Sequence, residues 1–245
     1  MGFNKNEGFI NKDNLHIFAY TSVDIVKSDI KAIILDFHGL GHTGFMSEPT
    51  HFAKQLAELG GVTIFPYYGP WAWMNFTAIN FVDDVVAAFL DKYNLPETTP
   101  IISSGGSMGG CSALAYTRYA RITPVACAVN CPVCDLPFHC TERDDLPRTM
   151  YNAFGSYECG LQKAMELHSP LHLAPQMPDI PYMFAHGTID PAVNKASHSD
   201  KMVAAMKNTG HSVEYLEVEG MGHCNLGDFP ESADTYNDFI KGFIK

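Results

Sequence analysis

The feature that most constrains the fold of this chain is a regular alternation of strand-like and helix-like segments. Short apolar runs of strand length, such as KAIILDF at 31–37 and PIISS at 100–104, are followed by longer segments with apolar residues at helical spacing. The expected strands are 31–37, 62–66, 100–104, 123–130, 181–187 and 212–220, and the expected helices are 50–61, 78–94, the segment after Ser107, 197–210 and 231–245. Strands that alternate regularly with helices predict an α/β fold with a mostly parallel, twisted sheet and helices on both faces.

Two parts of the chain depart from this alternation. Near the N-terminus, GFIN and LHIFAYTSV are separated by Lys12-Asp13-Asn14, and this pattern predicts a β-hairpin. The segment at about 131–180 is rich in Pro, Cys and His and contains helical pieces, LPRTMYNAFG and GLQKAMELH. We expect it to form a small cap insertion above the carboxyl edge of the sheet, where ligands bind in such folds. No repeat or linker divides residues 1–245, so we expect a single domain.

The acidic composition limits the classes of partner. The chain has 27 Asp and Glu against 16 Lys and Arg and no basic run, which argues against nucleic acid or an anionic membrane. The N-terminus lacks an apolar stretch long enough for a signal peptide, and no later segment approaches a membrane span. Seven cysteines without a secretion signal indicate reduced thiols, so we expect a cytoplasmic protein.

A glycine-rich turn, SSGGSMGG, surrounds Ser107 between an expected strand and an expected helix. It satisfies G-x-S-x-G in the context that a nucleophile elbow requires. A phosphate loop of the Walker type is excluded because no lysine lies between Lys92 and Lys163, and the dinucleotide pattern G-x-G-x-x-G has no match here. From the pentapeptide alone, a purely structural turn stays open.

Chain order favours Ser107 as a nucleophile. A serine elbow needs a histidine base and an orienting carboxylate, which follow it in the order acid, then histidine. Asp190 in HGTIDPAV comes just beyond one expected strand, and His223 in EGMGHCN comes just beyond the next. Because parallel strands end at the same edge of a sheet, all three side chains are expected there.

Other acids and histidines compete for these roles. Asp135 also follows a strand, the one after the elbow helix, but the tight loop around Asp190 favours the latter. His211 opens a strand at the opposite edge and is expected to be a solvated turn residue. His198 is expected inside a helix and exposed, and His186 is expected to shape the Asp190 loop.

The oxyanion hole and the substrate pocket are expected at the same edge. LDFHGLGHTG ends an early strand, so the backbone N–H groups of Leu40 and Met108 are the expected oxyanion donors. The candidates for lining the substrate pocket are His38, Tyr68, Trp71 and Trp73. The aromatic loop FPYYGPWAWMNF fits a pocket wall and a loop packed by its own tryptophans equally well.

The segment CPVCDLPFHC contains enough ligand types for zinc, in Cys131, Cys134, His139 and Cys140. Structural zinc sites usually have a second ligand pair well separated in sequence, so small apolar cysteines are favoured here. Cys224, beside the expected base, is expected to pack rather than to react. We expect neither a metal nor a cofactor.

Together these segments resemble the α/β-hydrolase superfamily, and within it the catalytic domain of the prolyl oligopeptidase family and related small carboxylesterases of the dienelactone hydrolase and feruloyl esterase type. GGSMGG is similar to that family's serine signature, and HSPLHLAPQMPDIPYMFAHGTIDPAV is similar to its acid segment. DKMVAAMKNTGHSVEYLEVEGMGH is similar to its final helix, strand and histidine loop. The resemblance covers residues 31 to 245 and implies Ser107, Asp190 and His223 as a catalytic triad.

The resemblance implies a serine hydrolase that forms an acyl-enzyme. The chain leaves no room for the N-terminal β-propeller of the large peptidases, so we expect a carboxylesterase for small acyl, acyl-sugar or aromatic esters. A small serine peptidase of prolyl oligopeptidase type, an acyltransferase and a non-catalytic hydrolase-fold binding protein are the alternatives. The expected partner is a small-molecule ester, and a homodimer stays open.

Overall fold

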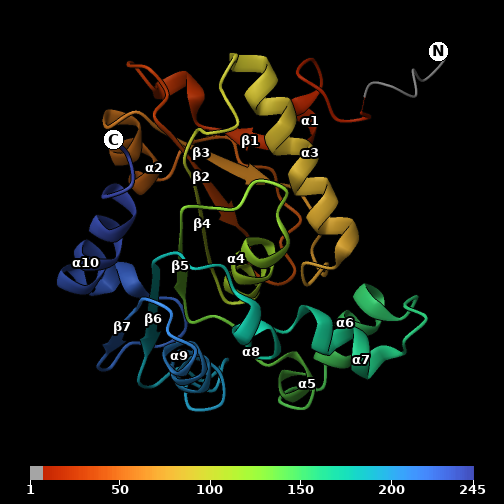
Figure 1. Ribbon diagram of the computed structural model, residues 1–245. Helices are drawn as coiled ribbons and strands as arrows, with labels where there is room; N and C mark the ends of the chain where they lie inside the picture. The colour runs from red at the N-terminus through yellow and green to blue at the C-terminus, as the bar shows by residue number, and fades with distance from the viewer. Residues whose placement is uncertain (1–7) are drawn as a thin grey trace.

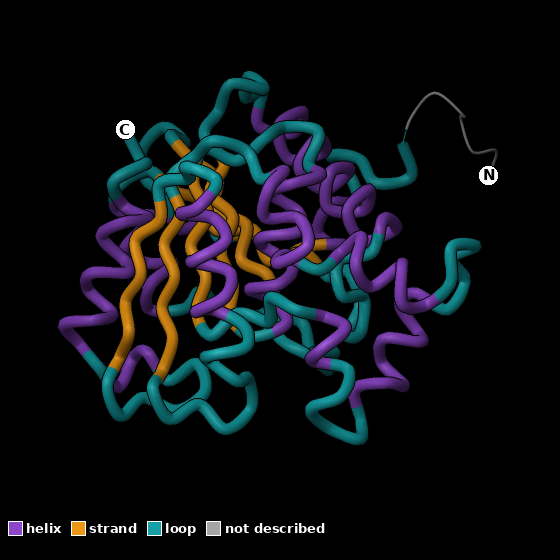
Figure 2. The backbone as a smooth tube through the Cα atoms, turned by 60° about the horizontal axis from the view of Figure 1, so that its bottom comes forward, coloured by secondary structure: helices purple, strands orange, loops and turns teal. Residues whose placement is uncertain are grey.

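The computed structural model describes residues 8–245 and contains one seven-stranded sheet in the order β1-β3-β2-β4-β5-β6-β7. The strands are β1 (Ala19–Thr21), β2 (Ala32–Phe37), β3 (Gly61–Pro66), β4 (Ile101–Gly106), β5 (Ala126–Asn130), β6 (Tyr182–Gly187) and β7 (Val213–Val218). The short β1 pairs antiparallel with β3, and every other pairing is parallel. Figure 2 shows the strands side by side. Because the strands other than β1 are parallel, their carboxyl ends lie at one common edge of the sheet.

Helices cover both faces of this sheet. The α-helices are α1 (Leu15–Phe18), α2 (His51–Glu58), α3 (Phe76–Tyr93), α4 (Met108–Tyr119), α5 (Leu136–His139), α6 (Leu146–Phe154), α7 (Leu161–His168), α8 (Pro170–Leu173), α9 (Ser199–Asn208) and α10 (Pro230–Lys241), with 3₁₀ turns η1 (Val23–Ile25), η2 (Ala174–Gln176) and η3 (Leu226–Asp228). In Figure 1, α2 and α10 lie on one side of the strands and α3 and α4 on the other. Within residues 8–245, no helix has both the length and the apolar character that crossing a membrane requires.

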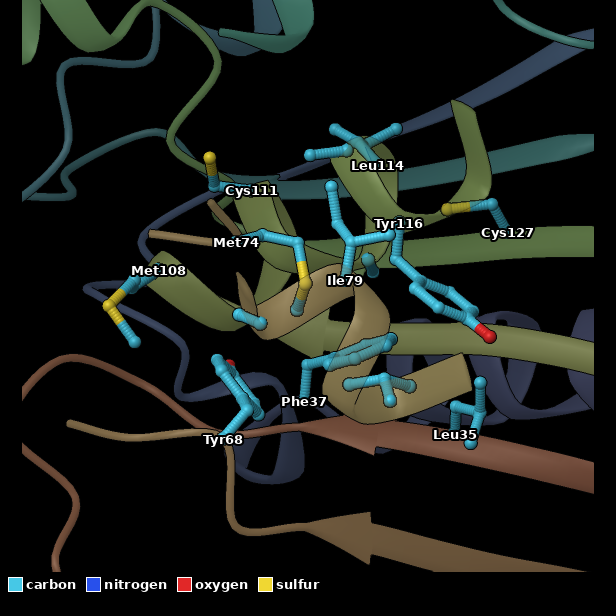
Figure 3. Packing of buried hydrophobic residues seen from close by; sticks show 14 of the residues in the cluster. Leu35, Phe37, Tyr68, Met74, Ile79, Met108, Cys111, Leu114, Tyr116 and Cys127 are labelled. Atoms are coloured by element: carbon cyan, nitrogen blue, oxygen red, sulfur yellow. The ribbon is translucent and has the colours of Figure 1, made fainter. Parts of the chain in front are cut away.

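Each face of the sheet carries its own apolar core. Along β2, Ile33, Leu35 and Phe37 face the core beneath α3 and α4, part of which Figure 3 shows. The alternate residues Ala32 and Ile34 belong to the second core, together with side chains of α2 and α10. A strand buried on both faces needs a continuous apolar run, which explains the sequence of β2 and confirms the expected α/β fold.

The N-terminal hairpin expected from the sequence is wrong. Residues 8–14 form no strand, residues 15–18 form the helical turn α1, and β1 pairs with β3 instead of with a preceding strand. The Asn14 side chain donates to Phe9 O at 2.8 Å and accepts from Asn11 N at 2.8 Å. These side-chain bonds to the backbone close a local turn and replace the ladder that a hairpin would need.

The cap insertion expected at about 131–180 is confirmed. It separates β5 from β6 and contains α5, α6, α7, α8 and η2. In Figure 1 the helices α5, α6 and α7 stand away from the sheet, beyond α8. Residues of this insertion contribute to the wall of a cavity at the carboxyl edge, described below.

Candidate active site

Ser107 occupies the junction between the end of β4 and the start of α4. Its backbone has φ 58° and ψ −126°, a sparsely populated conformation for a residue with a side chain. The Ser107 N–H donates to Asn130 O at 3.0 Å, and its carbonyl accepts from Gly110 N at 3.0 Å and Cys111 N at 3.2 Å. These bonds hold the sharp turn that the sequence pattern predicts, with the serine at its tip.

Two glycines allow the elements around this turn to approach each other closely. A Cβ at Gly105 would lie 2.5 Å from Gly109 O, and a Cβ at Gly109 would overlap Phe37 O at the end of β2. Glycine at both positions therefore brings β2, β4 and the first turn of α4 together beneath Ser107.

Gly109→Ala should lower the free energy of unfolding by about 1–3 kcal/mol, because the added Cβ forces α4 away from β2. The control is Gly227→Ala, since a Cβ at Gly227 has nothing within 4 Å, and its effect should stay within about 0.5 kcal/mol. Denaturant unfolding of the two variants and the wild type measures both values. Equal losses in the two variants would contradict the close approach at Gly109.

Asp190 and His223 meet at the edge of the sheet from the loops after β6 and β7. His223 Nδ1 donates to Asp190 Oδ2 at 2.8 Å, and the Asp190 side chain is fully buried. Asp190 Oδ1 accepts from the N–H groups of Ala192 and Val193 at 2.8 and 3.0 Å. Because Nδ1 of His223 carries a hydrogen toward the carboxylate, Nε2 is the nitrogen that has the lone pair in the neutral imidazole.

The contact between Asp190 and His223 lowers the pKa of Asp190 and raises the pKa of His223, as expected for an ion pair. Burial alone would raise the pKa of Asp190, but hydrogen bonds from His186, His223 and the backbone outweigh it and hold that pKa well below its usual range. Burial alone would lower the pKa of His223, but the Asp190 carboxylate, together with Cys131, raises it to about 9. The carboxylate therefore stabilises the imidazolium, the form that an imidazole takes after accepting a proton.

Ser107 and His223 line the same cavity, whose volume is about 500 Å³. Its wall also includes Leu40 from the loop after β2 and His139 and Arg143 from the cap insertion. A cavity of this size lies within the range of about 300–1,000 Å³ that is usual for small-molecule sites.

Of the two residues expected to supply oxyanion donors, one shares the cavity with Ser107 and the other follows Ser107 in the chain. Leu40 lines the cavity, and Met108 is the first residue of α4. The Met108 side chain is fully buried in the core that Figure 3 shows, so the group that the sequence suggests as a donor is its backbone N–H. The first N–H groups of a helix have no acceptor within the helix, and the helix dipole favours an anion there.

Of the four pocket candidates from the sequence, Trp73 lines this cavity. Trp73 is fully buried, and its indole N–H donates to Thr149 Oγ1 of α6 at 3.0 Å, which ties the aromatic loop to the cap insertion. His38 and Tyr68 are buried and stack on each other with ring centroids 4.1 Å apart. Trp71 borders a neighbouring depression instead. The aromatic loop thus contains both a pocket wall and packing residues.

Asp135, the competing acid, is engaged elsewhere. It is the N-cap of α5, and its Oδ1 accepts from Phe138 N at 3.1 Å. The carboxylate that contacts His223 is that of Asp190. Capping gives a structural reason for an aspartate in this position after β5.

The expectation that His198 is exposed is wrong. His198 precedes α9 and is fully buried. Its Nδ1 accepts from Cys134 N at 3.0 Å and Asp135 N at 3.1 Å, and its Nε2 lies 2.8 Å from Glu142 Oε2. The imidazole therefore joins α9 to the start of the cap insertion, a contact between segments that are distant in the sequence.

Of the two other histidines, His186 has the role expected from the sequence and His211 is less exposed than expected. His186 is buried at the end of β6, with Nδ1 2.7 Å from Ser199 Oγ and Nε2 3.2 Å from Val193 O, so it fixes the Asp190 loop as expected. His211 lies in the turn before β7 and is half-buried rather than fully solvated, with a buried Nε2 that has no partner within residues 8–245.

The four residues that the sequence offers as zinc ligands, Cys131, Cys134, His139 and Cys140, do not form one ligand group within the described part of the chain. Cys131 lies beside Cys224 and His223, whereas His139 lies beside Glu142 and His198. Cys224 does more than pack: it lines the cavity, and its Sγ lies 3.8 Å from His223 Nε2.

His139 and Arg143 are cavity residues that sequence reasoning did not assign to the pocket. His139 bonds through Nδ1 to the Glu142 carboxylate, which orients its ring. The available signal was their place in an insertion above the carboxyl edge, where polar side chains meet a ligand. Which residues of an insertion face a cavity is decided by the packing of its helices, and the sequence pattern does not specify that.

A parallel sheet, a serine on a strained strand-to-helix turn and a buried carboxylate–imidazole pair at the same edge define the α/β-hydrolase superfamily. Residues 78–243 match the prolyl oligopeptidase family. The chain belongs to this family of serine hydrolases, as the sequence resemblance predicts. No curated protein sequence matches the chain.

Solved structures of hydrolases share the fold at low sequence identity. The uncomplexed acylaminoacyl peptidase of Pyrococcus horikoshii is 14% identical with a TM-score of 0.73, and the match covers 89% of this chain and 38% of that chain. Esterase B from Lactobacillus rhamnosis is 14% identical with a TM-score of 0.68, and the match covers 89% of this chain and 76% of that chain. A puromycin hydrolase is 17% identical with a TM-score of 0.72, and the match covers 89% of this chain and 34% of that chain. The chain thus spans little more than a third of the length of the peptidases that it matches.

Proposed function

We propose that this protein is a serine carboxylesterase in which Ser107 is the nucleophile, His223 the base and Asp190 the orienting acid. The observation that carries the proposal is the 2.8 Å bond from His223 Nδ1 to the buried Asp190, with His223 and Ser107 in one cavity wall. The carboxylate fixes the imidazole so that Nε2 is free to accept the serine proton.

The reaction proceeds in two acyl-transfer steps. Ser107 Oγ attacks the ester carbonyl while its proton passes to His223 Nε2, and the Leu40 and Met108 N–H groups bind the tetrahedral oxyanion. The imidazolium then gives that proton to the departing alcohol, which leaves an acyl-enzyme. Water attacks the acyl-enzyme with the same histidine as base, and the carboxylic acid and free Ser107 are regenerated.

The size of the cavity favours an ester over a peptide substrate. A volume of about 500 Å³, enclosed partly by His139 and Arg143 of the cap insertion, suits a compact acyl or aromatic group rather than an extended polypeptide. The match to esterase B also extends over 76% of that chain, whereas the match to the acylaminoacyl peptidase extends over 38% of that chain. A small serine peptidase is the second candidate, favoured by the family match itself.

Hydrolysis of p-nitrophenyl esters should be fast and hydrolysis of aminoacyl p-nitroanilides slow, with kcat/KM values separated by at least about 10². Acetyl, feruloyl and longer-chain esters compared side by side identify the preferred acyl group. An initial burst of nitrophenol, equal to the enzyme concentration, reports the acyl-enzyme.

The reverse preference, for anilides, would assign the peptidase instead. A burst followed by transfer of the acyl group to an added alcohol in place of water would assign an acyltransferase. A folded protein that neither turns over esters nor reacts with a fluorophosphonate probe would be a non-catalytic binding protein.

A further inference from the structure

Two thiols lie directly beside the imidazole of His223. Cys131 follows β5, and Cys224 follows His223 in the loop after β7. The Cys224 N–H donates to Cys131 Sγ at 3.4 Å, and Cys224 Sγ lies 3.5 Å from Asn130 O. Both cysteines have a positive φ, 45° and 58°, which is uncommon outside glycine and asparagine and indicates that the surrounding structure holds them in place.

The spacing of three ligand atoms suits a tetrahedral metal ion. Cys131 Sγ, Cys224 Sγ and a ring nitrogen of His223 all lie within 4.8 Å of one another, and Cys224 Sγ is 3.8 Å from His223 Nε2. With bonds of zinc length to sulfur and nitrogen, neighbouring ligand atoms in a tetrahedral site are about 3.5–3.8 Å apart. The group therefore needs only a small contraction to bind an ion.

The surroundings supply the orientation and the access that such a site needs. Asp190 accepts the Nδ1 hydrogen of His223, an arrangement that orients zinc-binding histidines and raises their basicity. Cys224 and His223 line the cavity, so an ion can reach them, whereas Cys131 is fully buried behind them. Two thiolates and one imidazole leave the fourth position of a tetrahedral ion open toward the cavity.

We propose that Cys131, Cys224 and His223 form a binding site for Zn²⁺, and that Zn²⁺ bound there inhibits the enzyme. Binding requires Cys131 and Cys224 as thiolates and His223 as a neutral imidazole, so the protons that these groups carry on Sγ and Nε2 pass to solvent as the ion binds. The effect on turnover rests on the proposed function, because it requires His223 Nε2 to be the base. Binding of the ion does not depend on that function.

The two other candidate groups within the described residues are poorer ligands. His198 Nδ1 already accepts two backbone N–H bonds, so its Nε2 carries the hydrogen toward Glu142 and has no lone pair for an ion. His186 faces Ser199 Oγ and Val193 O with its two nitrogens, and the carbonyl requires a hydrogen on Nε2. His223 differs from both because its Nε2 faces a thiol of the proposed site, Cys224 Sγ at 3.8 Å, rather than a carboxylate or a carbonyl.

The test is a calorimetric titration of the reduced, metal-free full chain with Zn²⁺. We expect one ion per chain, and Cys131→Ser and Cys224→Ser should each weaken binding by at least about 10–100-fold. The control Cys159→Ser, at an exposed thiol that is not part of this ligand group, should bind as the wild type does. With Co²⁺ in place of Zn²⁺, a thiolate-to-metal charge-transfer band should appear in the wild type and weaken in the two variants.

Activity is measured in the same titration, with each variant normalised to its own rate without metal. Zn²⁺ should inhibit the wild type with the midpoint found by calorimetry, and a chelator should restore turnover. Binding that is unchanged in both cysteine variants, or absent from the wild type, would overturn the site. Stoichiometric binding lost in the variants, but without inhibition, would support the site and overturn His223 as the base. The circular dichroism of each variant verifies that it is folded.

Discussion

Ser107→Ala should reduce kcat for p-nitrophenyl esters by about 10⁶-fold, the scale of loss on removing the nucleophile of a serine hydrolase. The reason is chemical, because without Oγ no acyl-enzyme forms and the remaining groups can only assist water. The burst of nitrophenol should disappear with the turnover. A fluorophosphonate probe should add its mass to the wild type and not to the variant.

Ser104→Ala is the matched control for this prediction. Ser104 lies on β4, the strand that ends just before Ser107. It is buried, and its Oγ lies 3.4 Å from Tyr236 Oη rather than in the cavity that Ser107 lines. It should keep both labelling and the burst. The thermal midpoint of Ser107→Ala should stay within about 2–4 °C of the wild type, since a change of that size corresponds to about 1 kcal/mol in a chain of this length. Labelling of Ser107→Ala at the wild-type rate would show that another residue is the nucleophile.

The course of the chain explains why so much of the site could be predicted. Parallel strands end at one edge, so residues that directly follow β4, β6 and β7 meet there whatever the details of packing. Ser107, Asp190 and His223 each follow one of these strands, and the structure brings the last two into contact. The alternation of strand and helix thus predicts that Ser107 and His223, which are more than a hundred residues apart in the sequence, line one cavity.

The errors come from residues whose partners are fixed by tertiary packing or by local side-chain bonds. His198 looks like an exposed helix residue, yet the cap insertion folds over it and uses both of its nitrogens. Asn14 closes a turn with its side chain where an alternating pattern suggests a hairpin. In the same way, no spacing rule links Cys131 to Cys224, because their contact depends on the loops after β5 and β7.

Asp190→Asn should lower kcat by about 10⁴-fold while the protein stays folded, and Asp135→Asn should leave kcat nearly unchanged. Asp190 Oδ1 accepts two backbone N–H groups, so the oxygen of an asparagine must take that place and its NH₂ must face His223. An NH₂ donates, which forces His223 Nδ1 to accept and puts the hydrogen on Nε2, where it blocks removal of the serine proton.

At Asp135 the same substitution has no such consequence. Asparagine caps helices as well as aspartate does, and its oxygen can still accept from Phe138 N. Steady-state turnover and the rate of fluorophosphonate labelling of both variants decide the matter, since labelling needs the same proton transfer from Ser107. If Asp135→Asn lost turnover and Asp190→Asn retained it, the acid would be Asp135, and the 2.8 Å bond between Asp190 and His223 would serve the stability of the loop rather than catalysis.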